Sequence, residues 1–138
     1  DLRVTVYDGK THAVDGKEVA FVAAARKATV EAIRKASAIV LEPMVNVSVL
    51  APENAMGDVT GDLASRRGHV TGTASSVKGS VTISALVPLA ELENYQGRLK
   101  SLTGGKGAYS IAFSHYAQAP STVQSALAGK YKAVEIDD

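Results

Sequence analysis

The sequence predicts an α+β fold: a ferredoxin-like sandwich, in which two βαβ halves interleave, preceded by a smaller α/β region. The first observation behind this prediction is an internal repeat with a shift of 36 residues. It relates six pairs of positions: Leu50 with Leu86, Pro52 with Pro88, Gly61 with Gly97, Leu63 with Leu99, Ser65 with Ser101, and Gly68 with Gly104. Each copy reads as strand, proline, helix, glycine, strand, and two such copies form a split βαβ fold.

The second observation is the alternation of apolar and polar residues, which fixes the expected elements. We expect strands at about 44–51, 68–75, 79–87 and 107–117, helices at about 52–66 and 88–102, and a turn from Ser75 to Gly79. By parity, the sheet face that meets the helices carries Val45, Val47, Val49, Val70, Val81, Ile83, Tyr109, Ile111 and Phe113. The opposite, hydroxyl-rich face carries Asn46, Ser48, His69, Thr71, Thr73, Thr82, Ser84, Ser110 and Ser114.

The third observation is a different pattern before residue 44. Alternating Leu2, Val4 and Val6 predict a strand at 2–7, and Asp8-Gly9-Lys10 a turn. Asp15 and Glu18 fit a capping box, which would begin an alanine-rich helix at about 16–36. A short buried strand should follow at 39–41, with Pro43 at a boundary. We therefore expect three parts: 1–43, 44–118, and a helical tail at 119–138 with apolar spacing at Val123, Ala126 and Leu127.

Composition excludes several classes of protein. The net charge is +1, too balanced for sequence-blind adhesion to nucleic acid or anionic membranes. The absence of cysteine removes disulfides and fits a reducing compartment. No signal peptide and no apolar run of about 18 residues is present. We expect a soluble cytoplasmic protein with no membrane partner.

Motifs for catalysis or cofactor binding are missing. Gly104-Gly105-Lys106-Gly107 lacks the spacing of a phosphate-binding loop and instead fits a helix cap that runs into a strand. The histidines have no metal-ligand spacing, and no nucleophile elbow occurs. Asp58 and Asp62 share a helix face, where Asp62 can pair with Arg66. We therefore predict no catalytic, metal or cofactor-binding residue in this chain.

Binding of single-stranded RNA by base stacking is also disfavoured. Residues 106–113, KGAYSIAF, partly match the aromatic strand signature of RNA-recognition motifs. Ala108 and Ser110 occupy the two positions where that mode of binding needs aromatic rings.

The most informative stretch is 57–68, GDVTGDLASRRG. Each interior helix glycine costs about 1 kcal/mol relative to alanine, so Gly57 and Gly61 require a reason, such as close backbone packing. Arg66 and Arg67 suit the negative end of a helix dipole, and Gly68 suits a left-handed cap. A well-capped helix with a solvated charged face explains this run on physical grounds alone.

The same run resembles the signature of the C-terminal domain of translation elongation factor G. The family order continues in LEPMVNVSVLAPE (41–53), LVPLAEL (86–92), LKSLTGGKGAYSIAF (99–113) and HYAQAP (115–120). Upstream, VTVYDGKTHAVDGKEVAF (4–21) resembles the end of the preceding domain. The resemblance covers nearly the whole chain. It implies a ferredoxin-like domain V at 44–118, preceded by the end of a domain IV that is like ribosomal protein S5, with a tail helix that packs back on the latter.

The resemblance implies a ribosome-binding portion of a translational GTPase that promotes movement of tRNA and mRNA. GTP and Mg²⁺ would be bound by a GTPase domain of the parent protein that this chain does not contain. The loop at 9–18 matches the domain IV tip that enters the decoding region, with His12 at the tip, Asp15 at the helix start, and Lys17 beside it. We also expect Arg66 and Arg67, with Lys100 and Lys106 at the same edge of the sandwich, to form a patch that faces rRNA.

Several positions depart from the family pattern. Gly16 and Lys17 stand where the family usually has two serines, Ala64 where it often has asparagine, and Ser75-Ser76-Val77 at an arginine-glycine feature. These departures suggest a divergent paralogue, and the alternative function for such a paralogue is ribosome recycling or protection. A free-standing ferredoxin-like binding or regulatory domain is the alternative without a ribosome.

Residues 1–43 are expected to form an incomplete domain. The alanine-rich face of the helix and the edge of strand 2–7 would normally be covered by strands that precede Asp1. In isolation this region should lean on the tail helix near Val123 and Leu127, pair with a second copy of the chain, or remain mobile.

Overall fold

The computed structural model describes residues 2–14, 16–76 and 79–131, and it divides into two compact units, Asp1–Ile39 and Val40–Asp138. Three expectations fall outside the described residues: Asp15 as a helix cap and contact residue, part of the turn at 75–79, and the end of the tail at 132–138.

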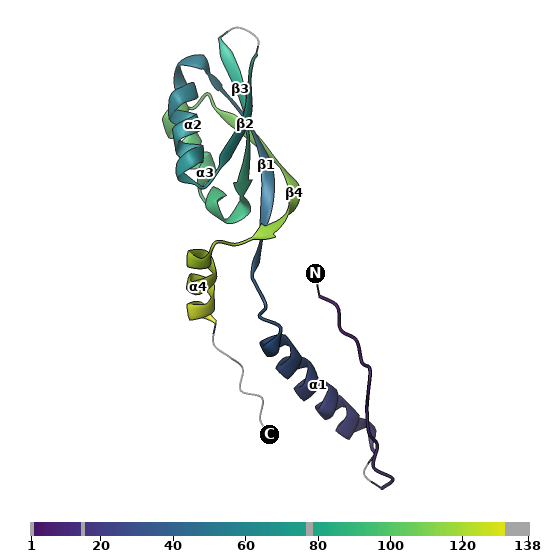
Figure 1. Cartoon of the computed structure of the whole chain (residues 1–138). Coiled ribbons are helices and arrows are strands. Elements are labelled where there is room, and N and C mark those ends of the chain that lie inside the picture. Colours follow the sequence, from purple (N-terminus) through teal and green to yellow (C-terminus); the bar gives the residue numbers. More distant parts are fainter. Residues whose placement is uncertain (1, 15, 77–78, 132–138) are drawn as a thin grey trace. The chain divides into compact units, whose positions relative to one another are not determined.

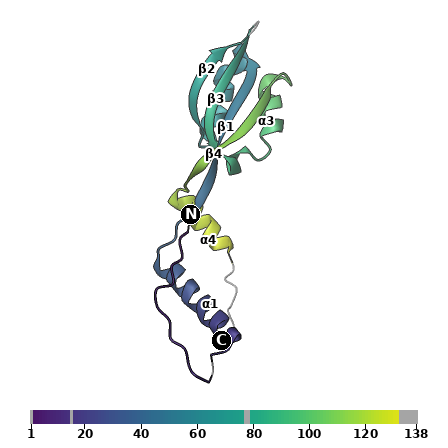
Figure 2. The same ribbon diagram turned by 90° about the vertical axis from the view of Figure 1, so that its right-hand side faces the viewer.

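The second unit contains a four-stranded antiparallel sheet with the order β2-β3-β1-β4 (Figures 1 and 2). The strands are β1 (Leu41–Pro52), β2 (His69–Ser75), β3 (Ser80–Pro88) and β4 (Ala108–Gln118). With one helix after β1 and one after β3, this order is that of the ferredoxin-like split βαβ fold. The predicted fold class is confirmed.

The repeat is visible at the start of both sandwich helices. Pro52 and Pro88 end their strands, and each caps a short 3-10 turn, η1 (Glu53–Ala55) or η2 (Leu89–Leu92). The turns lead into α2 (Met56–Ser65) and α3 (Tyr95–Thr103), which lie on the same side of the sheet in Figure 1. Proline suits these positions because its fixed φ is preset for a helical start and its missing N–H would have no helical partner there.

The core lies between these helices and the sheet. Val47, Val49 and Ile83 from the sheet meet Leu63 of α2 and Leu99 of α3, all at most 1% exposed. The predicted face is correct for the central strands, but the expectation that the helices cover all of it is wrong for half of β4. Pairing across from Val45 and Val47 puts Phe113 and Ile111 on that face, yet they are 60% and 48% exposed. As an edge strand, β4 meets α3 mainly near Tyr109 and runs on past the helices.

One bulge changes the parity of β2. The register shifts between Val70 and Gly72, so Thr73 pairs with Ile83 and shares the helix-side face. We expected Thr73 on the polar face, and that expectation is wrong. A bulge inserts an extra residue, and every later side chain then points to the other side.

The first unit contains α1 (Glu18–Lys35), which is preceded by an extended segment. The predicted strand at 2–7 is wrong, because these residues form no strand ladder. Alternation alone gives an extended chain, and a strand also requires a neighbouring strand. None of the residues of α1 is buried, and Leu2, Val4 and Val6 are exposed.

The separate strand expected at 39–41 is also absent, since residues 38–40 are irregular and β1 begins at Leu41. β1 continues through Pro43, which pairs with Tyr116 of β4. Proline is tolerated here because pairing with β3 begins only at Met44, so one side of Pro43 is an edge. After β4, the tail forms α4 (Ser121–Lys130), as its apolar spacing indicates.

Candidate functional site

The end of α2 is closed by a double hydrogen bond of the Schellman type. The Gly68 N–H donates to the Leu63 carbonyl at 2.9 Å, and the Arg67 N–H donates to the Ala64 carbonyl at 3.1 Å. The left-handed residue is Arg67, with φ 59°, and not Gly68 as we expected. Gly68 is needed for space, because a Cβ there would lie 2.5 Å from the Leu63 oxygen. Sequence reasoning placed the cap correctly and assigned its left-handed residue one position late.

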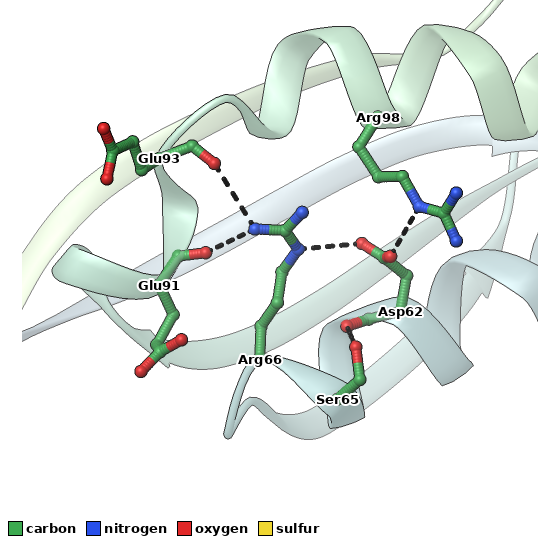
Figure 3. A network of polar contacts seen from close by, with 6 residues as sticks. All are labelled: Asp62, Ser65, Arg66, Glu91, Glu93 and Arg98. Carbon is green, nitrogen blue, oxygen red and sulfur yellow. Dashed lines mark hydrogen bonds and ion pairs between the residues drawn. The ribbon is translucent and has the colours of Figure 1, made fainter.

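Asp62 of α2 joins the two sandwich helices by accepting hydrogen bonds from Arg66 and from Arg98 of α3 (Figure 3). The Arg66 Nε donates to Asp62 Oδ2 at 2.9 Å, and Arg98 of α3 donates to Asp62 Oδ1 at 2.8 Å. Arg66 Nη1 also donates to the backbone carbonyl of Glu91 at 2.5 Å. The Asp62 side chain is only 8% exposed, so its charge is neutralised inside the helix pair.

Arg67 joins the start of β1 to η2. Its guanidinium makes a two-pronged contact with Glu42, at 2.8 Å for each pair of atoms, and its Nε donates to Glu91 Oε1 at 2.9 Å. Glu42 is 11% and Arg67 is 31% exposed at the side chain. Fork-to-fork geometry of this kind is the strongest form of arginine–carboxylate pairing.

The charges of this network shift the titration of its members. The hydrogen bond from Arg67 lowers the pKa of Glu42 despite its burial. Burial tends to raise the pKa of Asp62, but the hydrogen bonds from Arg98 and Arg66 outweigh it and lower the pKa. Burial next to Asp62 raises the pKa of Tyr95 to about 12. Both carboxylates therefore stay ionised at neutral pH.

Tyr95 completes the joint between the helices. Its ring is fully buried, lies 5.2 Å from the Arg66 guanidinium carbon, and packs edge-on against Tyr109 at 5.0 Å. Its hydroxyl is buried and makes no hydrogen bond within the described part of the chain. Arg66 and Arg67 thus have a clear structural role, which holds α2 against α3 and β1.

The four basic residues that we grouped do not lie together. α2 ends beside His69, which pairs with Leu86 near the end of β3. α3 ends before Ala108, which pairs with Leu50 of β1. Leu50 lies opposite the start of β3. Leu50 pairs in turn with Thr82, four residues from Leu86 along β3, so the two helix ends are offset by about 13 Å along the strand direction. The expectation of a common edge is wrong because β1 and β3 are antiparallel, so the helices that follow them are antiparallel as well.

Lys100 and Lys106 are both exposed at the end of α3. Gly104 and Gly105 there adopt left-handed φ values of 59° and 83°, and the Gly105 N–H donates to the Lys100 carbonyl at 2.8 Å. This geometry confirms a helix cap that runs into β4.

The loop before α1 carries the remaining predicted contact residues. His12 begins a turn: its ring Nδ1 accepts from the Val14 N–H at 3.3 Å, and its carbonyl accepts from the Gly16 N–H at 3.1 Å. His12 and Lys17 are exposed, and Lys17 is the residue before the first turn of α1. The turn therefore presents the His12 imidazole at the N-terminal end of α1.

Gly57 and Gly61 are not explained by close packing within the chain. A Cβ at either position would meet no atom within 4 Å. Both face open space, so close backbone packing against the described residues is not the reason for these glycines.

A hollow on the sheet is lined by uncharged side chains. This shallow hollow of about 320 Å³ is lined by polar side chains of Asn46, Ser48, Thr71, Ser84 and Ser110, with short apolar neighbours. No aromatic ring lines it, as expected from Ala108 and Ser110. This hollow offers neither a stacking surface nor a charge for a nucleotide.

Metal-binding clusters and membrane-spanning helices are both absent from the described residues. These residues contain no group of three or more His, Asp or Glu side chains placed to hold a metal ion. None of their helices has the length and apolar character that a bilayer crossing requires.

Sequence reasoning missed Glu42, Glu91 and Arg98. The repeat could have found Arg98, since a shift of 36 places it over Asp62, with which it pairs. Glu42 and Glu91 come from distant segments, and only the fold shows that they meet Arg67.

Comparison with known proteins agrees with this fold. Residues 39–127 match the family model for the elongation factor G C-terminus, and residues 1–37 match that for elongation factor G, domain IV. Elongation factor G 1 from Colwellia psychrerythraea is 43% identical over 136 residues, which cover 99% of this chain and 19% of that protein. A solved structure from Thermus thermophilus has a TM-score of 0.74 and 40% identity, over 88% of this chain and 18% of the other.

The chain thus spans about a fifth of the length of the curated relative. The domain IV match covers the loop and α1, and the C-terminus match covers the sandwich. On these matches and this fold, the chain belongs to the elongation factor G family, with residues 1–37 matching domain IV and residues 39–127 matching the C-terminus.

Proposed function

We propose that this chain is the ribosome-binding C-terminal portion of a translational GTPase that promotes movement of tRNA and mRNA. The observation that carries the proposal is the similarity over 99% of the chain to an elongation factor G. In the whole protein, GTP and Mg²⁺ would be bound by a GTPase domain outside this chain. The setting would be the cytoplasm, where ribosomes translate.

Two separate surfaces would contact RNA. The first is the loop at His12 and Lys17, which we propose lies near tRNA and mRNA. The second is the sandwich, where exposed Lys100 and Lys106 lie at one end of the sheet. Arg66 and Arg67 lie at the other end and keep part of their side chains exposed, 20% and 31%. In this proposal they hold the corner in shape through their ion pairs and contact phosphate only through the remaining surface.

Binding of the intact 138-residue chain to bacterial ribosomes tests the proposal. We expect co-sedimentation that full-length elongation factor G competes away. Because phosphate contacts release counterions, replacing Lys100 and Lys106 by alanine should reduce the slope of log affinity against log salt by about one for each lysine that touches a phosphate. Gln96→Ala, an exposed neutral change on α3, is the matched control.

Failure of the folded chain to bind ribosomes at low salt would favour the free-standing binding domain. Binding that supports ribosome splitting but not movement of mRNA, when this segment replaces its counterpart in an active elongation factor, would favour a recycling paralogue. The departures from the family pattern at Gly16, Lys17 and Ala64 are the reason to test for a recycling paralogue.

A further inference from the structure

The attachment of α4 to the sandwich is unusual in its chemistry. α4 has ten residues, and none of its side chains is buried. Its larger apolar side chains are only partly covered, since Val123 is half-buried and Leu127 is 46% exposed. A helix of this length is marginal in water, and apolar packing contributes little to it here. Something other than burial must therefore hold α4 against the end of the sheet.

The side-chain amide of Gln124 supplies that attachment. Its Oε1 accepts from the Val40 N–H at 3.2 Å, and its Nε2 donates to the Ala119 carbonyl at 2.7 Å. The Ala119 N–H donates in turn to the Val40 carbonyl at 2.9 Å. The carboxamide orientation is fixed by these partners, because only one placement of O and N satisfies both.

These bonds continue the ladder between β1 and β4 by one rung. Leu41 pairs with Gln118, so the next antiparallel pair is Val40 with Ala119. A hydrogen-bonded pair of this kind exchanges two N–H···O bonds. Here one of the two is direct, and the Gln124 amide stands in for the other, as a peptide group would.

The result is a closed ring of three hydrogen bonds at the point where the chain enters and leaves the sandwich. Ala119 is 1% exposed, so its carbonyl is largely removed from water and needs a partner. On the upstream side, residues 38–40 have no regular structure, and Ser37 adopts a left-handed φ of 51°. The ring thus separates the ordered ladder from an irregular connection.

We propose that Gln124 is the latch that fixes α4 to the sandwich, so that α4 and the sheet move as one body and breaking the latch frees α4. The latch is polar and directional. A side chain of similar size without an amide should therefore fail to replace it.

Amide hydrogen exchange by NMR on the whole chain tests the latch. In Gln124→Ala and in Gln124→Leu, we expect exchange at Val40 and through α4 to rise about tenfold or more, because each hydrogen bond is worth about a factor of ten. Val47 and Ile83 should keep their protection. Gln96→Ala, a change of the same type at an exposed position of α3, should alter none of these rates.

Two outcomes overturn the proposal. Unchanged exchange in α4 of Gln124→Ala means that α4 is held by other contacts. Wild-type protection in Gln124→Leu means that apolar contact and not the amide holds it.

A measurement on the unmodified chain removes any dependence on the folding of variants. The two side-chain NH₂ protons of Gln124 should exchange with water markedly more slowly than those of Gln96. Equal rates for the two side chains would overturn the latch even if every variant unfolded.

Discussion

The helices α1 and α2 differ in how much of their surface is buried. α1 has 18 residues and buries none of them, whereas α2 has ten and fully buries Val59 and Leu63. The difference does not come from apolar content, since α1 carries Phe21, Val22 and Ile33 with many alanines. The difference in burial depends on whether a sheet is present for the helix to pack against. The sheet covers α2, and in the first unit the structure describes no sheet for α1.

An apolar pattern that favours a helix therefore does not by itself bury that helix. More than half of the residues of α1 are apolar, and some recur three or four positions apart, as at Phe21, Ala25, Ala28 and Ala32, which is the pattern of a helix that packs against another surface. We therefore expect residues 18–35 to gain stability only when a partner surface is supplied, while the sandwich is stable alone.

The largest predicted effect comes from truncating a core leucine. Leu63→Ala should lower the free energy of unfolding of the sandwich by about 3 to 4 kcal/mol, because it leaves a cavity against Val59 and Ile83. Phe21→Ala on α1 should change it by less than about 0.5 kcal/mol. Urea unfolding followed by circular dichroism measures both. Equal losses would mean that α1 belongs to the same cooperative body.

The sequence predicted α2 well because its repeat, its proline start and its buried leucine agree with one another. The sequence-based predictions were wrong where a residue's structure or burial depends on contacts with a distant segment. Strand 2–7 needed a partner strand, and Phe113 needed a helix above it. The left-handed residue was placed at Gly68, since glycine is the usual choice. The structure places it at Arg67, whose side chain is held by Glu42 and Glu91.

The next effect is loss of the arginine that joins β1 to η2. Arg67→Ala should cost about 2 to 3 kcal/mol, since it leaves the Glu42 carboxylate largely buried without its partner. Arg34→Ala in the last turn of exposed α1 is the matched control and should have little effect. Thermal unfolding measures the pair. A loss of less than about 0.5 kcal/mol at Arg67 would show that its ion pairs are solvent-screened.

Acid should weaken the sandwich on the order of 1 kcal/mol as the pH falls from about 5 to about 2. The pKa values of Asp62 and Glu42 are lowered in the folded state, mainly by hydrogen bonds from arginines. Their contribution is therefore present above the unfolded pKa near 4 and is lost as the pH falls through the folded values.

The pH dependence of urea unfolding checks this expectation. Asp62→Asn with Glu42→Gln should flatten the acid slope, whereas Glu31→Gln on exposed α1 should leave it unchanged. A slope that persists in the double variant would place the acid sensitivity elsewhere.

The smallest effect is a gain. Gly61→Ala should stabilise the sandwich by about 0.7 kcal/mol, because a Cβ there meets no atom and alanine favours the helix. Gly9→Ala, in the extended segment of the first unit, should not move the melting temperature of the sandwich. If Gly61→Ala also weakens ribosome binding, a partner approaches the α2 backbone at that point. A loss of stability would contradict the open space around Gly61.

Residue-level hydrogen exchange on the 138-residue chain tests the contrast between the two units most directly. Ultracentrifugation first checks that the sample is monomeric. We predict that amides of Val47, Val49 and Ile83 exchange only through global unfolding, and that Leu63→Ala speeds them in proportion to its loss of stability. Amides within α1 should exchange far faster and should not respond to that change. If α1 is as protected as β1 and β3 in the monomer, the two units are one integrated domain and the account is wrong.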